Sequence, residues 1–270
     1  MEKKNVIITG ASSGIGKALV YEYFKKGFQI TMAARNVEAM EVIAKDIDPK
    51  GDLILMVQTD VTLEKDCQNL IEKSVERFGK IDILINNAGI SMRAIFNDMH
   101  LDVMRRVMDV NFWGTVYCTK YAIPYLLQSK GSLVGVISIA GHLGLPARSA
   151  YSASKFAVRG LLDTIRVENL KKNLHVLVAA PGFTASNVRL SALDANGSQQ
   201  GETPRDESKM MTSEEVAQKI VKAVDRRKAE LILTFVEGKL SVFLKKFFPR
   251  WIEKLTYNHM AKEPNSPLNK

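Results

Sequence analysis

The residues whose types could carry chemistry gather in one stretch, 138–155, which reads Ser-Ile-Ala-Gly-His-Leu-Gly-Leu-Pro-Ala-Arg-Ser-Ala-Tyr-Ser-Ala-Ser-Lys. Tyr151 and Lys155 are four residues apart, so on a helix they are offset by about 40° and project from one face. A phenol titrates near 10, but a cation about 4 Å away at an effective dielectric of about 20 contributes roughly 4 kcal/mol, or about three pKa units. This spacing favours Tyr151 as an acid or base, and a purely structural Tyr–Lys pair is the alternative.

The elements that position this stretch follow a regular alternation along the chain. Short β-branched runs alternate with longer periodic segments, which is typical of βαβ units and a parallel sheet. We predict an α/β fold, a Rossmann-like doubly wound sheet of seven parallel strands with helices on both faces. The strands are expected near 5–9, 28–34, 53–58, 81–86, 132–138, 174–180 and 230–235. The helices are expected near 14–26, 36–47, 63–78, 98–128, 149–171 and 213–227.

A glycine-rich loop, Thr9-Gly10-Ala11-Ser12-Ser13-Gly14-Ile15-Gly16, follows the first predicted strand and opens the first predicted helix. Glycines permit a tight turn and a close backbone approach to a ligand. The free N–H groups and the dipole of a helix N-terminus favour a pyrophosphate. The loop therefore indicates dinucleotide binding, and a tight strand-to-helix turn without a ligand is the alternative.

The second and third predicted strands end in residues suited to the adenosine half of such a cofactor. Ala34 stands where an acidic residue would meet a free ribose 2′-hydroxyl, and Arg35, suited to a 2′-phosphate, follows it. This pair favours NADPH over NADH, unless Arg35 only covers the sheet edge. Asp60, followed by Val61, could reach the adenine amino group, although an Asp that only stabilises a turn is the alternative.

Asparagines mark the next two positions of interest. The fourth strand runs into Asn86-Asn87-Ala88-Gly89, whose small and amide side chains could admit a cofactor and join neighbouring strands, or only form a turn. Asn111 lies in the middle of a predicted helix, where an Asn is locally unfavourable. We expect Asn111 to kink the helix or to hold a water, and a surface polar residue is the alternative.

Together these segments resemble the short-chain dehydrogenase/reductase family over essentially residues 3–236. The resemblance rests on six features in order: the loop at Thr9–Gly16, Asn-Asn-Ala-Gly at 86–89, Asn111, Ser138, Tyr-x-x-x-Lys at Tyr151 and Lys155, and Pro181-Gly182 after the sixth strand. Ser186 stands four residues after Gly182, where the family often has Thr. This departure affects only the expected contact with the cofactor carboxamide.

The resemblance implies an NADP(H)-dependent oxidoreductase that transfers a hydride between the cofactor and a carbonyl or secondary alcohol. It implies that Tyr151 is the general acid or base, that Lys155 lowers its pKa and binds the nicotinamide ribose, and that Ser138 donates to the substrate oxygen. Asn111 is expected to hold a water that extends a proton relay through Lys155. The expected cofactor-binding residues are Gly10, Ser12, Ser13, Gly14, Ile15, Gly16, Arg35, Asp60, Val61, Asn87, Ala88, Gly89, Tyr151, Lys155, Pro181, Gly182, Thr184 and Ser186.

The substrate is less well defined by the sequence. An apolar pocket is predicted from Met92, Phe96, Leu143, Leu145 and the loop 182–212, which we expect to act as a lid. A sterol or a long-chain 3-oxoacyl thioester would fit such a pocket, and a sugar or a small ketone is the alternative. His142 is the one histidine near the site and could line the pocket, and a solvated histidine or one satisfied in the core is the alternative. The histidines and cysteines show no metal-ligand spacing, so no metal site is expected.

Composition bounds the architecture and the compartment. With 270 residues and 46% hydrophobic residues, the chain suits one large domain, which we assign to 1–238, with an extension at 239–270. Cys67 and Cys118 are predicted to be reduced and inert. The first residues show no signal-like apolar region and no segment is long enough to span a membrane, so we expect a cytoplasmic protein.

The net charge of +9 is largely a property of the extension, which holds seven basic and two acidic residues. Its apolar stripe comprises Leu240, Leu244, Phe247, Phe248, Trp251 and Leu255, and Pro249 should divide it into two short helices. Three roles are open: docking on its own domain or a partner subunit, peripheral membrane contact through 239–262, and cover for an apolar pocket.

Two further classes of function and the assembly state complete the expectations. A non-catalytic NADP-binding regulator or scaffold is the alternative to an enzyme, but it would have little need for Ser138, Tyr151 and Lys155 together. Nucleic-acid binding is not expected, because only the basic extension supports it. The family resemblance implies a homodimer or homotetramer with the helices at 98–128 and 149–171 in the interface.

Overall fold

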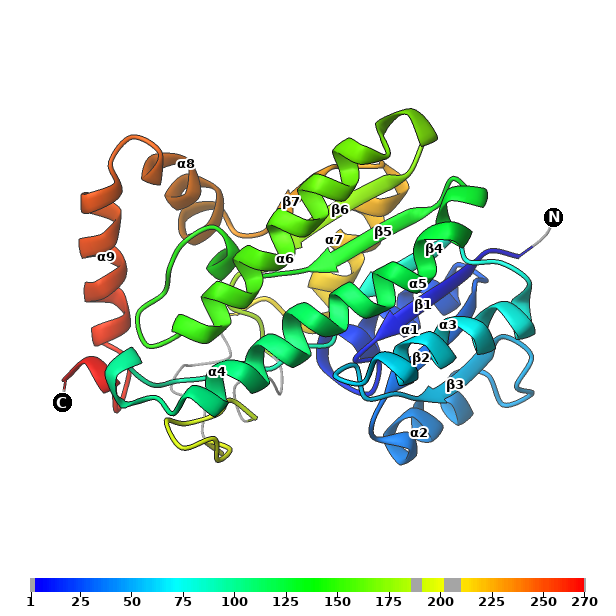
Figure 1. Ribbon diagram of the computed structural model, residues 1–270, viewed down its shortest axis with the longest axis horizontal. Coiled ribbons are helices and arrows are strands. Elements are labelled where there is room, and N and C mark those ends of the chain that lie inside the picture. The colour runs from blue at the N-terminus through cyan, green and yellow to red at the C-terminus, as the bar shows by residue number, and fades with distance from the viewer. Residues whose placement is uncertain (1–2, 186–190, 202–209, 270) are drawn as a thin grey trace.

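The protein is described by a computed structural model that covers residues 3–185, 191–201 and 210–269. Its centre is a seven-stranded parallel sheet in the order β3-β2-β1-β4-β5-β6-β7 (Figure 1). The strands are β1 (Asn5–Thr9), β2 (Gln29–Ala34), β3 (Ile54–Gln58), β4 (Ile83–Asn86), β5 (Ser132–Val136), β6 (His175–Ala180) and β7 (Glu230–Ile232). The predicted α/β fold is confirmed.

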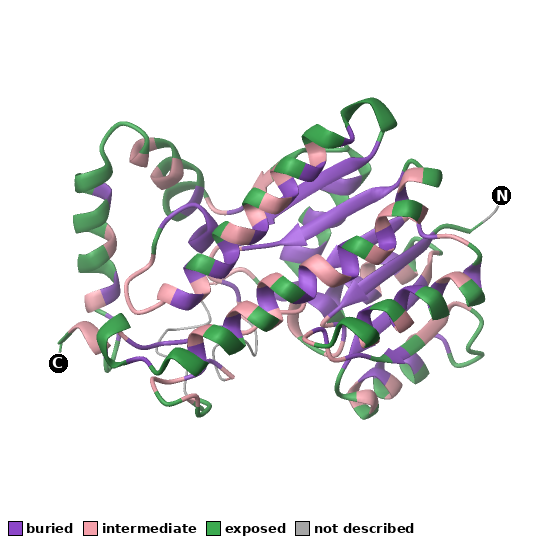
Figure 2. Cartoon of the chain, viewed as in Figure 1, coloured by how far each residue is buried: buried purple, intermediate pink, exposed green. Residues whose placement is uncertain are grey.

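Helices cover both faces of this sheet, as Figure 1 shows. One face packs against α1 (Gly14–Lys25), α2 (Val37–Ile47) and α7 (Ser213–Asp225), and the other against α3 (Glu64–Phe78), α5 (Gly114–Gln128) and α6 (Ser149–Glu168). Val6 and Ile8 of β1 belong to the first core and Ile7 to the second, because alternate side chains of a strand point to opposite faces. The inner strands β1, β2, β4, β5 and β6 are accordingly buried along almost all of their length (Figure 2), whereas the edge strands β3 and β7 are mostly not.

The order of the strands fixes where a ligand can bind. The chain runs outward from β1 through β2 to β3, then returns to β4 on the other side of β1. Because β1 and β4 are parallel neighbours whose following helices lie on opposite faces, a crevice opens at their carboxyl ends. The glycine-rich loop after β1 and the Asn-Asn-Ala-Gly segment after β4 therefore meet at one place.

The single helix predicted over 98–128 is two helices, α4 (Leu101–Met108) and α5, joined by a π-helical turn at Asp109–Trp113. The turn contains Asn111, so the expected distortion of the helix at this residue is present. A π-helical turn accommodates one extra residue in the helix and is frequent at functional sites. In this chain it turns the side chain of Asn111 into the protein interior, where Asn111 is 1% exposed.

The last strand is shorter than the predicted 230–235, because β7 ends at Ile232 and Thr234 adopts a positive φ of 66°. A β-branched residue in that region cannot continue a strand. The chain then enters a π-helical turn at Phe235–Leu240, which leads into the C-terminal extension.

The two cysteines, distant in sequence, meet between α3 and α5. Both are buried, and the hydrogen bond from Cys67, together with burial, raises the pKa of the Cys118 thiol. A buried thiol that stays protonated is a poor nucleophile, which supports the prediction that these cysteines are inert.

The C-terminal extension forms α8 (Ser241–Lys245) and α9 (Pro249–Ala261), and Pro249 stands at the first position of α9 as predicted. Ile252 of α9 packs against Ile139 and Leu143, so the extension docks on its own domain. After α9 the chain returns toward the loop before α4, where the C-terminus lies in Figure 1. Across the described ranges, no helix has both the length and the apolarity needed to cross a bilayer.

Candidate active site

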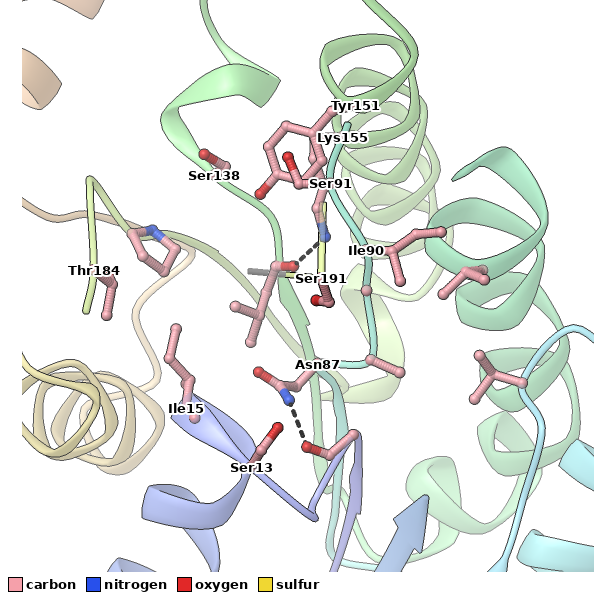
Figure 3. Close-up of a pocket in the computed structure, with 18 of the residues that line it drawn as sticks. Ser13, Ile15, Asn87, Ile90, Ser91, Ser138, Tyr151, Lys155, Thr184 and Ser191 are labelled. Carbon is pink, nitrogen blue, oxygen red and sulfur yellow. Dashed lines mark hydrogen bonds between the residues drawn. The ribbon is translucent and has the colours of Figure 1, made fainter. Parts of the chain in front are cut away.

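A cavity of about 460 Å³ opens at the carboxyl edge of the sheet (Figure 3). It extends from the glycine-rich loop, past the ends of β4 and β5, to the N-terminus of α6 and the residues after β6. Most of the predicted site residues line it: Gly10, Ser12, Ser13, Gly14, Ile15, Arg35, Asp60, Val61, Asn87, Ala88, Gly89, Ser138, Tyr151, Lys155, Pro181, Gly182 and Thr184. Of the remaining three, Gly16 and Asn111 lie behind the wall, and Ser186 falls outside the described residues.

The glycine-rich loop is a backbone cradle with no room for side chains. Gly10 has a φ of +66°, and a Cβ there would lie 2.9 Å from the Cα of Ala88. A Cβ on Gly16 would overlap the carbonyl oxygen of Gly10 and lie 2.7 Å from Nδ2 of Asn87. Ser13, the N-cap residue of α1, makes no side-chain cap hydrogen bond. The free N–H groups of α1 and the hydroxyl of Ser13 therefore fit the pyrophosphate of a nicotinamide dinucleotide.

Asn87 holds this cradle against the end of β4. Its Nδ2 donates to the carbonyl oxygen of Thr9 at 3.0 Å, and Oγ1 of Thr9 accepts from the backbone N–H groups of Asn87 and Ala88, both at 3.0 Å. The expectation that the Asn-Asn-Ala-Gly segment joins neighbouring strands is confirmed. Asn86 acts in the same way toward α5, where its Nδ2 donates to Oγ1 of Thr119 at 2.9 Å.

The adenosine end of the cavity holds Arg35, Asp60 and Val61. Arg35 follows the end of β2 with an exposed side chain at the rim. Oδ1 of Asp60 accepts from the backbone N–H and the hydroxyl of Thr62, at 3.0 and 2.8 Å. Asp60 thus stabilises a turn, which the sequence analysis gave as the alternative to binding adenine. It also lines the cavity.

Three side chains that could act on a carbonyl or alcohol meet at the middle of the cavity, as Figure 3 shows. Ser138 follows β5, and its hydroxyl is hydrogen-bonded to that of Tyr151. Tyr151 and Lys155 lie one turn apart in α6, and Nζ of Lys155 is 5.7 Å from the centre of the Tyr151 ring. Nζ donates to the carbonyl oxygen of Val136 at 3.0 Å, so the end of β5 fixes both the hydroxyl and the ammonium group.

Burial dominates the titration of this pair. It raises the pKa of Tyr151, while the hydrogen bond from Ser138 and the charge of Arg148 lower it. Burial also lowers the pKa of Lys155 to about 8. The net direction for Tyr151 is the opposite of the one expected from its spacing to Lys155, because desolvation of the phenolate outweighs the nearby positive charges.

Asn111 lies behind the cavity wall and hydrogen-bonds with two of the segments that form it. Its Oδ1 accepts from the backbone N–H of Ile90 at 2.8 Å, and its Nδ2 donates to the carbonyl oxygen of Ile90 at 3.0 Å and to Oγ of Ser154 at 2.9 Å. A Cβ on Gly89 would lie 3.2 Å from Oδ1 of Asn111 and 3.3 Å from Nζ of Lys155. Asn111 and Lys155 therefore both lie beside Gly89, and the proton relay through them stays a prediction.

The segments after β6 form the remaining wall. Pro181, Gly182 and Thr184 line the cavity, and the hydroxyl of Thr184 donates to the carbonyl oxygen of Gly182 at 3.1 Å. The described part of the loop 182–212 also contributes Ser191, Leu193 and Gln199 to the lining. Leu193 pairs with the chain after β4, since its N–H donates to the carbonyl oxygen of Ser91 at 2.9 Å. The described part of this loop thus borders the cavity, and its role as a lid stays a prediction.

Of the four residues predicted to form an apolar pocket, only Leu145 lines the cavity. Met92 and Leu143 are buried in separate core clusters, and Phe96 is exposed at the surface. The sequence pattern could show that these residues are apolar, but not which side of the chain each one faces.

His142 does not line the cavity, and the alternative of a histidine satisfied in the core holds, because its buried ring hydrogen-bonds with Arg159. Burial, reinforced by the charge of Arg159, lowers the pKa of His142 to about 4. The short 3-10 turn at Ile139–Gly141, which Ser138 caps, carries His142 away from the cavity toward Arg159, one turn of α6 beyond Lys155.

Three charged residues of the lining, Arg106, Arg148 and Glu263, were not predicted. Arg148 lies within the stretch 138–155, three residues before Tyr151, so its position was a usable signal. Glu263 belongs to the C-terminal extension, 108 residues after Lys155, and no local pattern connects it to the site.

Solved structures share this fold. A short-chain dehydrogenase from Streptomyces avermitilis superposes with a TM-score of 0.82 at 23% identity, covering 97% of this chain and 98% of that chain. A short-chain dehydrogenase/reductase from Burkholderia phymatum in complex with NAD has a TM-score of 0.76 at 23% identity, covering 85% of this chain and 88% of the other. At these identities the likeness concerns the fold.

Sequence relatives are closer. The chain is 32% identical to mouse dehydrogenase/reductase SDR family member 7B over 97% of its own length and 82% of the relative's. It is 40% identical to 11-beta-hydroxysteroid dehydrogenase-like 2 of Arabidopsis thaliana over 68% of its own length and 60% of the relative's. The family model described as short chain dehydrogenase matches residues 4–196. With the cradle, the hydroxyl pair and the lysine all in place, the chain belongs to the short-chain dehydrogenase/reductase family of oxidoreductases.

Proposed function

We propose that the protein uses NADPH to reduce a carbonyl group on an apolar substrate. The observation that carries this proposal is one continuous cavity that holds the backbone cradle and Arg35 at one end, and the hydroxyls of Ser138 and Tyr151 farther along. A dinucleotide laid along the cradle would bring its nicotinamide toward these hydroxyls, since both lie at the carboxyl edge of the same sheet.

NADPH would supply the hydride that the carbonyl carbon accepts. The Tyr151 hydroxyl donates its proton to the carbonyl oxygen, and Ser138 donates a hydrogen bond to the same oxygen as negative charge develops there. Oγ of Ser138 accepts from the backbone N–H of Ala140 at 3.2 Å, which fixes the hydroxyl on the side of Tyr151. Lys155 and Asn111, which both lie beside Gly89, would extend the path by which Tyr151 regains its proton.

The state of Tyr151 suits its role as an acid. Because burial raises the pKa of Tyr151, the phenol stays protonated at neutral pH, and this is the form that donates to a carbonyl. The reverse reaction, oxidation of an alcohol, would use the phenolate as the base.

The preference for NADPH rests on Arg35, which meets the cavity at the end of β2 where the second ribose would lie. Titration of the protein with NADPH and NADH tests it. We expect NADPH to bind at least tenfold more tightly, and Arg35→Ala to remove most of that difference while leaving the affinity for NADH unchanged. Equal affinities of the wild-type protein for both cofactors would exclude the assignment to Arg35.

The apolar character of the substrate is supported by the side chains beyond the hydroxyls, which include Leu145, Phe183 and Leu193. The name of the relative from Arabidopsis thaliana, 11-beta-hydroxysteroid dehydrogenase-like 2, is in keeping with this character. A ketosteroid or a 3-oxoacyl thioester is the proposed substrate class. A screen of NADPH oxidation over ketosteroids, 3-oxoacyl thioesters, retinals and simple aldehydes would identify the substrate.

Tyr151→Phe tests the chemistry, because it keeps the ring and removes the proton. General acid catalysis typically contributes about 10²–10⁴-fold, so kcat should fall by at least about 100-fold. The affinity for NADPH should change less than threefold, and the control Tyr257→Phe, at an exposed tyrosine of α9, should behave as wild type. A Tyr151→Phe variant that reduced a substrate of the screen at near the wild-type rate would contradict the mechanism.

The alternative, an NADP-binding regulator or scaffold without turnover, predicts tight NADPH binding and no oxidation of NADPH with any compound of the screen. The assembly as a homodimer or homotetramer stays a prediction, and sedimentation equilibrium would establish the number of subunits.

A further inference from the structure

Ser91 carries a hydroxyl group that the mechanism described above does not use. The residue lines the cavity and is 7% exposed. Across the described ranges, no residue forms a hydrogen bond with Oγ of Ser91, whereas the hydroxyls of Ser138 and Tyr151 are hydrogen-bonded to each other. The Ser91 hydroxyl is therefore left to bond with a molecule that enters the cavity.

The neighbours of Ser91 place it next to the catalytic tyrosine. Ile90 and Met92, on either side of Ser91 in the sequence, pack in the same apolar cluster as the ring of Tyr151. In Figure 3 the Ser91 side chain lies at the Tyr151 end of the cavity, far from Ser13 of the glycine-rich loop. The hydroxyl thus faces the place of the reacting carbonyl rather than the place of the cofactor phosphates.

Hydrogen bonds on both sides hold the backbone at Ser91 in position. The carbonyl oxygen of Ser91 accepts from the N–H of Leu193 at 2.9 Å, and the N–H of Arg93 donates to the carbonyl oxygen of Leu193 at 2.7 Å. On the other side, the Asn111 side chain bonds with the N–H and the carbonyl oxygen of Ile90, at 2.8 and 3.0 Å. A hydroxyl on a segment fixed in this way can select one position on a ligand.

We infer that Ser91 is a specificity-determining residue, whose hydroxyl donates a hydrogen bond to a second oxygen of the substrate, close to the carbonyl group that is reduced. The inference rests on the proposed function, because it takes the cavity at Tyr151 as the substrate site. Water can bond with the Ser91 hydroxyl in the free protein, but a bound substrate displaces that water. A substrate with only hydrocarbon there would leave the hydroxyl unpaired at a cost in affinity, whereas a second oxygen replaces the lost hydrogen bond.

A second oxygen close to the reacting carbonyl distinguishes the two proposed substrate classes. In a 3-oxoacyl thioester, a single CH2 group separates the reacting carbonyl from the thioester carbonyl. The ring ketone of a ketosteroid is flanked by ring carbon atoms instead. Because Ser138 and Tyr151 bind the first oxygen, the Ser91 hydroxyl suits the second. Ser91 thus favours 3-oxoacyl compounds within the proposed function.

The experiment uses two ketones that differ by one oxygen, methyl 3-oxododecanoate and 1-methoxydodecan-3-one, with NADPH as the reductant. Ser91→Ala should lower the ratio of kcat/KM for the ester to kcat/KM for the ether about fivefold, which is the effect of a typical neutral hydrogen bond. The intrinsic reactivities of the two ketones cancel when this ratio is compared between proteins. The matched control is Ser198→Ala, which removes an exposed hydroxyl from the loop that borders the cavity, and its ratio should equal that of wild type.

Stability and cofactor binding show whether Ser91 has a merely structural role. Because no described residue bonds with Oγ of Ser91, its removal leaves no protein group without a partner. We expect Ser91→Ala to keep the wild-type free energy of unfolding in urea, and to bind NADPH within twofold of wild type. A ratio that fell only together with stability or with the affinity for NADPH would contradict a role in substrate selection.

A binding measurement separates a failure of this inference from a failure of the proposed function. The product alcohols, methyl 3-hydroxydodecanoate and 1-methoxydodecan-3-ol, cannot react with the NADPH-loaded protein, so calorimetry gives their affinities. If the wild-type protein reduced no carbonyl compound but Ser91→Ala still lowered the ester-to-ether affinity ratio about fivefold, the proposed function would fail and the role of Ser91 would stand. Ratios unchanged by Ser91→Ala in both measurements, or a wild-type protein that neither reduced the ketones nor bound the alcohols, would overturn the role of Ser91.

Discussion

The two ends of the cavity are built in different ways. At the cofactor end, Gly10 and Gly16 have no space for a side chain, because a Cβ at either position would meet backbone atoms. At the substrate end and in the helix behind it, a Cβ on Gly144 or Gly160 would meet nothing within 4 Å. The cofactor end is thus a close fit of backbone against backbone. The substrate end depends instead on side chains that come together from distant segments, such as Arg148 and Glu263.

This difference indicates which parts of the site can vary. A backbone cradle suits a ligand that is always the same, and almost any added atom damages it. A wall of side chains can change one residue at a time without disturbing the sheet, which suits a family whose members share a cofactor and differ in substrate. The comparison can be tested at both ends, with effects of decreasing size.

The largest effect is expected for Gly16→Ala. The added Cβ would overlap the carbonyl oxygen of Gly10 and crowd Nδ2 of Asn87 at 2.7 Å, so α1 must move away from the cradle. We expect the affinity for NADPH, measured by calorimetry, to fall at least 100-fold. The control Gly144→Ala adds the same atom where nothing lies within 4 Å, and should bind NADPH within twofold of wild type. If Gly16→Ala bound NADPH as tightly as Gly144→Ala, the cradle would not be the close backbone fit described above.

The same contrast explains which parts of the site the sequence could predict. The loop from Thr9 to Gly16 and the segment from Asn86 to Gly89 are contiguous, and each follows a strand whose carboxyl end the topology brings to the same edge. Their residue types and positions were therefore sufficient. Glu263 was not predicted as a lining residue, because its place in the cavity wall depends on the path of α8 and α9 back to the cavity. No local sequence pattern contains that path.

The expectations that the structure does not bear out share this cause. His142 is only four residues from Ser138, yet a short turn separates the two side chains, so that Ser138 lines the cavity and His142 contacts Arg159, one turn of α6 beyond Lys155. The sequence showed a continuous amphipathic pattern over 98–128, but the π-helical turn at Asp109–Trp113 divides it, since burial of Asn111 against Ile90 and Ser154 outweighs regular helical hydrogen bonding. Tertiary contacts decided both outcomes.

Lys155 lies where the two ends meet, and its charge should destabilise the fold. Burial lowers its pKa from 10.5 to about 8, and one pKa unit corresponds to about 1.4 kcal/mol, so the charge costs about 3 kcal/mol at pH 7. Lys155→Met removes this cost and loses the hydrogen bond to the carbonyl oxygen of Val136. We expect the free energy of unfolding in urea to rise by about 2 kcal/mol at pH 7, with loss of carbonyl reduction.

The destabilisation caused by the charge of Lys155 should depend on pH. Below pH 8, Lys155 is protonated in both the folded and the unfolded chain, and the destabilisation is complete. Between pH 8 and 10.5 the folded protein releases the proton while the unfolded chain keeps it, so the wild-type protein gains stability as the pH rises. The stability difference between Lys155→Met and wild type should therefore shrink over this range. A difference that is constant from pH 7 to 9.5 would show that the charge of Lys155 is not buried at a cost.

A smaller effect is expected at the outer face of the extension, which the structure leaves without a covering element in the described chain. Phe243, Phe247, Phe248, Trp251 and Leu255 are exposed there. Lys246, Arg250 and Lys254, also exposed, lie among them. Aromatic and basic side chains on one helical surface are typical of peripheral contact with anionic lipid. Membrane contact through 239–262 thus stays a prediction, now with a defined surface.

Flotation of the full-length protein with vesicles that contain phosphatidylserine tests this surface. We expect Phe247→Ser together with Trp251→Ser to reduce the bound fraction at least tenfold, because both rings would lose their apolar environment. The control Phe96→Ser removes an exposed ring from the body of the protein and should leave flotation unchanged. Equal flotation of all three proteins, or none by the wild type, would exclude membrane contact through this face.

The smallest effect is expected for Gly160→Ala in the middle of α6. Gly160 is exposed, and a Cβ there would meet nothing within 4 Å, so the substitution should act only through helix propensity. Alanine is favoured over glycine in a helix interior by about 1 kcal/mol, and the free energy of unfolding in urea should rise by about that amount. This result would confirm that Gly160 is unconstrained by close contacts, in contrast to Gly10 and Gly16. A loss of stability would mean that something outside this chain packs on α6 at Gly160. Because the helices at 98–128 and 149–171 are the expected interface of a homodimer or homotetramer, the destabilised variant should then also dissociate more readily in sedimentation equilibrium.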